Sequence, residues 1–295
     1  MDTITLDALN AATPDAFVAA LGDIYEHAPW VAAAAARRRP FAGVAGLHAA
    51  LAAAVDAAPE AERLVLVRNH PDLAGRAARA GEVTAHSAAE QAGAGLDRLS
   101  DAEYAAFHRL NDAYRAKFGF PFIVCVGRHT KDSILRQFER RLANAPADEL
   151  ATALAEVARI AALRLDRLVE GPDRLRVAGR LSTHVLDTHA GRPAAGVAVE
   201  LVEIAAAGPS RLLARAATNA DGRTDAPLIT GRPVPIGTYE LRFAIGDYFA
   251  AQGVAGGEPR FLDVVPLRFA VAEPEGHYHV PLLASPWSYT TYRGS

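Results

Sequence analysis

The stretch EGPDRLRVAGRLSTHVLD, residues 170–187, marks the place where the periodicity of the sequence changes. Before it, the chain is rich in alanine and arginine, and its apolar residues recur at helical spacing. After it, short β-branched runs alternate with turn signals such as THAGRP, NADGR and GVAGGEP. These patterns predict a multidomain protein, with an all-α helical bundle over residues 1–171 and an all-β sandwich over residues 176–295. We expect roughly seven or eight antiparallel strands in the sandwich.

Composition and charge exclude several classes of protein. Of the 295 residues, 51% are hydrophobic and 22% are charged, as in ordinary globular proteins. The net charge of -3 lacks the basic excess that nucleic-acid binding requires, and no segment has the roughly 20 apolar residues of a membrane helix. The single cysteine, Cys125, fits a reducing compartment. We therefore expect a cytoplasmic protein without nucleic-acid or membrane partners.

Three helices of the first half are predicted from apolar stripes. Ser100 and Glu103 form a capping box that opens the first of them. Arg164 falls on the apolar face of the third, where a charge needs an acidic partner or an anionic ligand. The residues of the three stripes are Tyr104, Phe107, Leu110, Tyr114 and Phe118; Ile134, Leu135, Phe138 and Leu142; and Leu150, Leu154, Val157, Ala161 and Leu168.

Histidines mark two predicted strands of the second half. Strand alternation places Ser182 and His184 on one face, and His277 and His279 on one face of another strand. These histidines could form a zinc site, or they could equally well be surface histidines on edge strands. Arg223 follows an Asp-Gly turn, where its guanidinium can grip a carbonyl-rich or anionic substrate or lie exposed.

Three motifs of this half, LSTHVLDTHAGRPA, DGR and the terminal YRGS, resemble 5-hydroxyisourate (HIU) hydrolase, the enzyme branch of the transthyretin-like family. The resemblance implies a transthyretin-like β-sandwich, a metal-free site at a dimer interface within a homotetramer, and ring opening by attack of water. It leaves His277 outside the site. The residues that it implies are His184 and His279 as catalytic groups, Arg223 as the substrate clamp, and Tyr292, Arg293 and Ser295 of the tail.

Each candidate residue of the first half, taken alone, can be explained by a structural role. His70 precedes a proline and is therefore predicted to lie in a loop. Ser87 and Glu90 fit a capping box that opens a helix, and residues 120–126 fit a buried apolar segment.

Together these residues resemble the 2-oxo-4-hydroxy-4-carboxy-5-ureidoimidazoline (OHCU) decarboxylase family. The match rests on YEHAPWV, HPDLAG, SAAEQ, YRAKFGFPFIVCV and RIAALRL, spread over nearly all of residues 1–170. It implies an all-helical, cofactor-free enzyme with His70 and Glu90 as catalytic residues. The substrate-binding residues that it implies are Pro71, Ser87, Gln91, Phe122, Ile123, Val124, Cys125, Val126 and Arg164.

The two resemblances describe consecutive reactions, because the hydrolase product is the decarboxylase substrate. They predict a bifunctional enzyme of urate catabolism that converts HIU through OHCU to (S)-allantoin, without a cofactor, as a homodimer or homotetramer. One rival is a non-enzymatic transthyretin-like carrier with a helical oligomerisation domain. Another is a zinc hydrolase that uses His184, His277 and His279.

Overall fold

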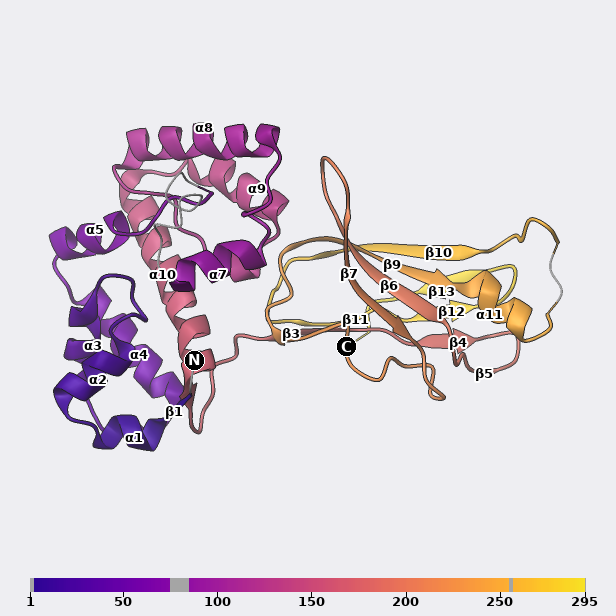
Figure 1. Ribbon diagram of the computed structural model, residues 1–295, viewed down its shortest axis with the longest axis horizontal. Coiled ribbons are helices and arrows are strands. Elements are labelled where there is room, and N and C mark those ends of the chain that lie inside the picture. The colour runs from indigo at the N-terminus through magenta and orange to yellow at the C-terminus, as the bar shows by residue number, and fades with distance from the viewer. Residues whose placement is uncertain (1–2, 75–84, 255–256, 295) are drawn as a thin grey trace. The chain divides into compact units, whose positions relative to one another are not determined.

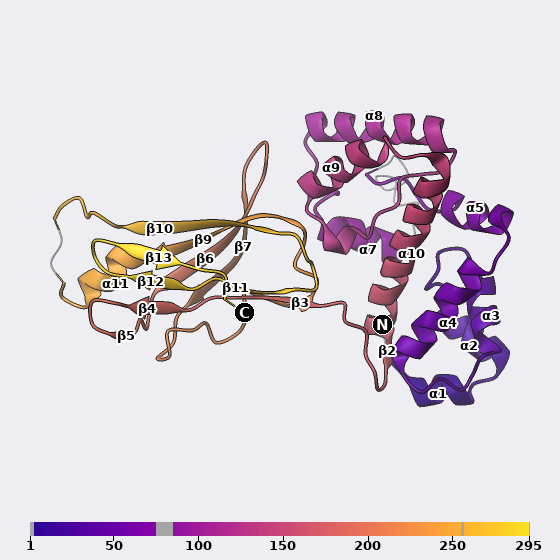
Figure 2. The ribbon, with the colours of Figure 1, turned by 180° about the vertical axis from the view of Figure 1, so that it is seen from behind.

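The computed structural model describes residues 3–74, 85–254 and 257–294. It divides into two compact units. The helical unit comprises Met1–Gly127 and Ser133–Val177, and the sandwich unit comprises Arg128–Asp132 and Ala178–Ser295. Figures 1 and 2 show helices in the first unit and sheets in the second, as the change of periodicity predicts. Among the described residues, no helix is long and apolar enough to cross a membrane.

Helices form nearly all of the first unit. A short parallel pair, β1 (Ile4–Thr5) with β2 (Val169–Glu170), ties its first element to its last. The helices are α1 (Leu6–Ala11), α2 (Pro14–Leu21), α3 (Pro29–Ala36), α4 (Val44–Asp56), α5 (Glu60–Arg68), α7 (Ala85–Gly93), α8 (Asp101–Phe118), α9 (Lys131–Arg141) and α10 (Pro146–Leu168), with a 3₁₀ turn at Val126–Arg128.

The predicted helix signals explain where α8 begins and ends. Ser100 Oγ accepts from the Glu103 N–H, and the Glu103 carboxylate accepts from the Ser100 N–H, so both bonds of the capping box are present. Gly119 then closes the helix with φ of 74°, a left-handed conformation that glycine adopts without a Cβ penalty. The helices predicted around Ile134 and Leu150 are α9 and α10.

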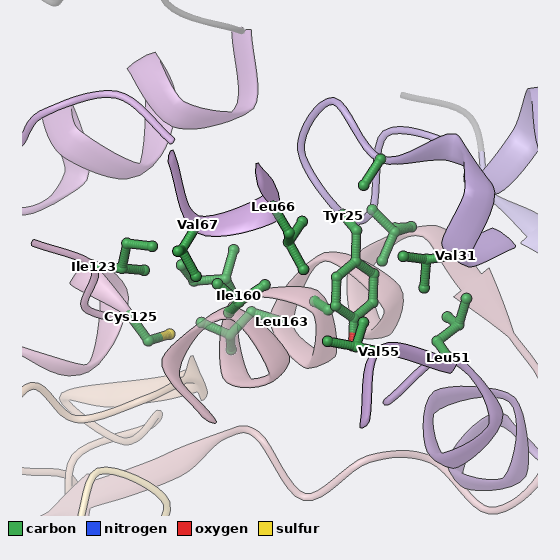
Figure 3. Packing of buried hydrophobic residues seen from close by; sticks show 14 of the residues in the cluster. Tyr25, Val31, Leu51, Val55, Leu66, Val67, Ile123, Cys125, Ile160 and Leu163 are labelled. Atoms are coloured by element: carbon green, nitrogen blue, oxygen red, sulfur yellow. The ribbon is translucent and has the colours of Figure 1, made fainter. Parts of the chain in front are cut away.

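The core of the helical unit lies along α10. Figure 3 shows Leu66 and Val67 from α5 gathered with Ile160 and Leu163 from α10. Burying an apolar side chain of this size contributes roughly 1.5–3 kcal/mol, so the contact fixes the end of α5 against α10. The loop that follows α5 is thereby held in place, and His70 lies in it.

Among the described residues, the sandwich unit has eleven strands and one helix, α11 (Ile245–Ala251), which was not predicted. The strands are β3 (Gly179–Ser182), β4 (Val185–Asp187), β5 (Arg192–Pro193), β6 (Ala198–Ile204), β7 (Arg211–Ala217), β8 (Ile229–Arg232), β9 (Gly237–Ala244), β10 (Val264–Val271), β11 (His277–His279), β12 (Leu282–Ala284) and β13 (Tyr289–Thr291).

The strand count exceeds the expected seven or eight in part because two predicted strands are interrupted at the same level, and in part because the two-residue β5 is counted as a strand. The LSTHVLD segment breaks between β3 and β4 at residues 183–184, and the HYHVPLL segment breaks between β11 and β12 at residues 280–281. Pro281 has no N–H to donate to a ladder. The two segments also run parallel to each other, so the prediction of an antiparallel sandwich was wrong for the pairs β11–β3 and β12–β4.

The sheet orders are β10-β9-β6-β7, β11-β3-β8 and β13-β12-β4-β5. Their inner faces share one core, in which Leu181, Val185, Leu241 and Phe243 are fully buried. His184 lies at the interruption between β3 and β4, where regular pairing gives way to an isolated bridge with Arg223. The strand break therefore places one of the predicted catalytic histidines.

Candidate active sites

A small, partly open pocket lies in the helical unit, and the about 360 Å³ of empty space around it includes open solvent. Ten of the residues that line it were predicted to contact or transform a substrate. They are His70, Pro71, Ser87, Glu90, Gln91, Phe122, Ile123, Val124, Val126 and Arg164, and the lining is completed by Glu26, Leu73 and Ile160.

His70 lies just beyond α5 and is only 7% exposed. Its Nδ1 lies 2.9 Å from the Leu66 carbonyl oxygen. Since a carbonyl only accepts, Nδ1 carries the hydrogen, and Nε2 bears the lone pair of the neutral ring. Burial lowers the pKa of His70 below its ordinary value, although the nearby Glu26 carboxylate opposes that change. His70 is therefore neutral at pH 7, with Nε2 as its proton-accepting atom.

Two amides hold the loop that follows His70. Gln91 Oε1 accepts from the Ala74 N–H at 2.9 Å, and Asn111 Nδ2 donates to the Leu73 carbonyl at 2.8 Å. Ala74 has φ of 51°, a conformation that is unfavourable for alanine and persists only when the surroundings enforce it. Gln91, predicted as a substrate contact, thus also supports the backbone of the pocket.

Arg164 projects from α10 into a cluster of acids and is 4% exposed. Its Nε and Nη2 bind the two oxygens of Glu90 at 2.9 and 3.0 Å, a bidentate arrangement, and Nη2 also lies 3.3 Å from Glu26 Oε2. Burial alone would lower the pKa of Arg164, but its hydrogen bonds to Glu90 and the two carboxylate charges raise it overall. The acidic partner that a buried charge on this helix face requires is therefore present.

Glu26 is the pocket residue that sequence reasoning missed. It is 3% exposed, and the Ser87 hydroxyl donates to its carboxylate, with oxygen distances of 2.7 and 2.9 Å. The predicted capping box at Ser87 was wrong, because α7 spans Ala85–Gly93 and Ser87 lies inside it. The available signal was an acid within the otherwise apolar run around Tyr25 and Trp30, since buried acids are rare without partners.

The segment from Phe120 to Val126 is buried, as predicted, and side chains behind it fix its backbone. Arg141 Nη1 donates to the Ile123 carbonyl at 2.7 Å, and Glu156 accepts from the Cys125 N–H at 2.8 Å. Cys125 itself is not among the residues that line the pocket. Its backbone N–H is directed to Glu156 instead.

The second candidate site begins at the interruption between β3 and β4. The Val185 N–H donates to the Gly222 carbonyl at 2.8 Å, and His184 forms an isolated bridge with Arg223. Gly222 has φ of 71°, and a Cβ there would approach the Val185 carbonyl oxygen at 2.3 Å. Only glycine therefore allows the turn that presents Arg223 beside His184.

The two predicted catalytic histidines contact each other. His184 Nδ1 lies 3.3 Å from His279 Nε2, with ring centroids 5.5 Å apart and ring planes 14° apart. This side-by-side geometry places the contact near the ring planes, where imidazole donates and accepts hydrogen bonds. Burial, and then the Arg223 charge, lower the pKa of His184. Burial and the neighbouring His184 and Arg223 lower that of His279, so both rings are neutral at pH 7.

Ser182 joins this pair to His277. Ser182 Oγ lies 3.0 Å from His279 Nδ1 and 3.2 Å from His277 Nε2. His277 falls outside the resemblance, yet the structure places it in the same cluster. Among the described residues, no group of three or more His, Cys, Asp or Glu side chains is arranged to hold a metal ion, so the geometry does not support the zinc reading.

The carboxyl-terminal tail packs on β11 through its backbone. The Gly294 N–H donates to the His279 carbonyl at 2.8 Å, and the Arg293 guanidinium lies 4.9 Å from the centre of the Tyr278 ring. Tyr292 is 55% exposed. Ser295 lies outside the described residues.

Comparison with protein families assigns both units. A model of OHCU decarboxylase matches residues 10–166, which is more than half of the chain, and a model of the HIUase/Transthyretin family matches residues 181–294. The chain belongs to both families. The helical unit is its OHCU decarboxylase part, and the sandwich unit is its HIUase/transthyretin part.

Relatives of each part support these assignments. A 5-hydroxyisourate hydrolase of Halalkalibacterium halodurans is 52% identical over 119 residues, 40% of this chain and 100% of the relative. A 2-oxo-4-hydroxy-4-carboxy-5-ureidoimidazoline decarboxylase of Haloferax volcanii is 46% identical over 165 residues, 56% of this chain and 96% of the relative. A crystal structure of (S)-allantoin synthase matches 99% of this chain and 100% of its own, with 35% identity and a TM-score of 0.52.

Proposed function

We propose that this chain is a bifunctional enzyme of urate catabolism that hydrolyses HIU to OHCU and decarboxylates OHCU to (S)-allantoin. The observation that carries the proposal is the end-to-end match of this one chain to (S)-allantoin synthase. In addition, each unit brings together the principal side chains that its own resemblance names.

In the hydrolase reaction, water attacks an acyl carbon of HIU and the ring C–N bond breaks. The nitrogen gains a proton and the acyl carbon becomes a carboxyl group. His184 and His279 are neutral at pH 7, so either can accept the proton of the attacking water. Arg223 supplies the positive charge that grips the substrate and stabilises the developing oxyanion.

In the decarboxylase reaction, the bond to the carboxylate breaks and CO₂ leaves. The electron pair is delocalised into the substrate's own imidazolone, and the same carbon then receives one proton. Neutral His70 takes one proton from solvent on Nε2, since its Nδ1–H is held by Leu66, and passes that proton to the carbon. Arg164 orients the Glu90 and Glu26 carboxylates in the pocket. Protonation from one face of the pocket gives one enantiomer.

We also propose that the two domains are residues 1–171 and 176–295 and that the chain acts as a homo-oligomer. The 55% exposure of Tyr292, a tail residue that the resemblance assigns to the hydrolase site, supports association of sandwich units.

The test uses HIU made in place by urate oxidase. Purified chain is added, and ultraviolet absorbance and circular dichroism are followed together. We expect faster loss of the HIU band and a growing (S)-allantoin signal. Decay of HIU at its spontaneous rate contradicts the hydrolase assignment, and racemic allantoin at the spontaneous rate contradicts the decarboxylase assignment. A carrier protein would leave both rates unchanged, and so would His70→Asn and His279→Asn variants of it.

A further inference from the structure

Ser182 and His277 extend the histidine pair of the sandwich unit into a chain of four side chains. The contacts run from His184 Nδ1 to His279 Nε2 at 3.3 Å, from His279 Nδ1 to Ser182 Oγ at 3.0 Å, and from Ser182 Oγ to His277 Nε2 at 3.2 Å. Ser182 is 9% exposed, the two catalytic histidines are half-buried, and His277 is exposed. The chain therefore leads from the site to solvent.

We propose that Ser182 and His277 form a proton relay that carries the proton released by hydrolysis from His184 and His279 to the solvent. This inference rests on the proposed hydrolase function. Neither residue needs to touch the substrate, because each acts through the next side chain. Both are positioning and relay residues rather than catalytic ones.

The reaction creates a proton that has to leave. Hydrolysis of an acyl C–N bond consumes one water, which supplies one proton to the leaving nitrogen and leaves a carboxylic acid. That acid ionises at neutral pH, since carboxyl groups have pKa values near 4. One proton is therefore released for each turnover, and the groups around the site determine its path.

The positive charges around the site disfavour keeping this proton on His184 or His279. Arg223 faces His184, while Arg223, Arg180 and His277 all act on His279. An imidazolium beside these cations in a half-buried site is unfavourable, because like charges at low dielectric repel strongly. Moving the positive charge to exposed His277 places it in water.

The hydrogen bonds permit this transfer with every atom accounted for. At the start His184 Nδ1–H donates to His279 Nε2, His279 Nδ1–H donates to Ser182 Oγ, and the Ser182 hydroxyl donates to His277 Nε2. When His184 Nε2 takes a proton from water, each of these three hydrogens moves one position along the chain. His277 then bears hydrogens on both nitrogens, and its exposed Nδ1–H is lost to solvent.

The return step restores the chain. After His277 loses its proton, its remaining hydrogen is on Nε2. The His184 Nε2–H then protonates the leaving nitrogen, the three hydrogens move back one position toward His184, and His277 takes one proton from water on Nδ1, which re-forms the starting tautomers. The proton of the attacking water thus leaves through the relay, the proton of the leaving nitrogen enters through it, and ionisation of the product carboxylic acid gives the net proton released. A hydroxyl is required at position 182 because it both donates and accepts.

The test compares Ser182→Ala, Ser182→Thr and His277→Gln with wild type in HIU hydrolysis, using the full chain. We expect Ser182→Ala and His277→Gln to lower kcat by roughly 100-fold, the lower end of the range for acid–base groups, with little change in KM. Ser182→Thr keeps the hydroxyl and should retain most of the activity. Added imidazole should restore part of kcat in His277→Gln but not in Ser182→Ala, where the break lies inside the site.

His189→Gln is the matched control, because His189 is an exposed histidine of the same unit outside the relay. It should leave kcat unchanged. Wild-type kcat for Ser182→Ala and His277→Gln, or equal loss in Ser182→Ala and Ser182→Thr, overturns the relay. If wild type itself fails to accelerate HIU decay, the hydrolase function fails and the relay with it. If wild type is active and the variants match it, only the relay fails.

Discussion

The two candidate sites are built in opposite ways. In the helical unit, Arg164 and Glu26 are almost fully buried, and Arg164 forms ion pairs with both Glu26 and Glu90. In the sandwich unit, the histidines form a row on parallel strands, and the row ends at exposed His277. The first site depends on charges that stabilise one another away from water. The second depends on neutral rings with a route to solvent.

This difference shows how each site sets the protonation state that it needs. Beside the buried carboxylates Glu90 and Glu26, the pKa of Arg164 is raised, so the guanidinium stays charged and compensates the loss of hydration of its partners. Half-buried imidazoles beside Arg223 remain neutral because burial, and then the nearby positive charge of Arg223, lowers the pKa of His184. An arginine thus has a stabilising role in one unit and a pKa-lowering role in the other.

His70→Asn should have the largest effect on activity, and only on one reaction. Removing the proton-carrying imidazole should lower the decarboxylation rate by about 10²- to 10⁴-fold. HIU hydrolysis should stay at the wild-type rate, so OHCU should accumulate and decay to racemic allantoin. Circular dichroism and ultraviolet absorbance measure the two steps. His108→Asn is the control, since His108 contacts Tyr104 on α8 and does not line the pocket. Formation of (S)-allantoin at the wild-type rate by His70→Asn would contradict the assignment.

Arg141→Met tests the buried charges behind the pocket. Arg141 binds Glu149, which is fully buried, so its loss leaves a buried carboxylate without its cation. We expect the free energy of unfolding of the helical unit to fall by about 3–5 kcal/mol. Urea titration followed by far-ultraviolet circular dichroism, which the helices dominate, gives this value.

Arg140→Met is the matched control, because Arg140 is exposed and its guanidinium donates to the neutral Gln137 side chain. Its effect should stay within about 0.5 kcal/mol. The double variant Arg141→Met with Glu149→Met should recover part of the lost stability, since it removes the unpaired charge. Equal stability of Arg141→Met and wild type would show that the pair is not needed.

The sequence predicted the elements better than the contacts between them. Apolar stripes and the Ser100 capping box give α8, α9 and α10, because these signals lie within one helix. The change of periodicity separates helices from strands, and the motifs identify most of the pocket residues. The helix signals and the change of periodicity are local features of the sequence. The pocket residues were predictable because their motifs are characteristic of a known family.

Features that depend on distant contacts were not predictable in the same way. Glu26 lies in the motif YEHAPWV, but its role as a buried partner depends on contacts with Ser87 and Arg164, which are distant in the sequence. The parallel pairing of β11 with β3 joins segments almost a hundred residues apart, and only that pairing places His277 beside Ser182. The capping box at Ser87 failed for a related reason, since the hydroxyl is used by a tertiary partner rather than by its own helix.

Gly294→Ala tests the exposed end of the second site. A Cβ at this position would lie 2.7 Å from His279 Cδ2, so the tail or the ring must move. We expect HIU hydrolysis to fall by about 10²-fold, the loss associated with a 1 Å displacement of a reacting group. Decarboxylation of OHCU should be unchanged. Gly191→Ala is a control with nothing within 4 Å of its added Cβ, although its φ of 68° makes some loss of stability expected there.

Arg223→Gln removes the substrate clamp, but it should change the histidine pKa values only slightly, and these pKa values separate the two roles of arginine most directly. Burial is the first cause of the lowered pKa of His184, and the Arg223 charge is the second, so removing the charge should raise that pKa while leaving it below the ordinary 6.5. The pKa of His279 should rise in the same direction, because Arg223 lowers it too. Histidine ¹H–¹⁵N spectra recorded across pH measure both values, and Arg215→Gln, on exposed β7, should change neither. Because both rings would then hold protons at higher pH, the acid limb of any remaining hydrolysis should also move upward. A His184 pKa that stays the same or falls in Arg223→Gln would mean that burial alone keeps the ring neutral, and the contrast between the two arginines would be lost.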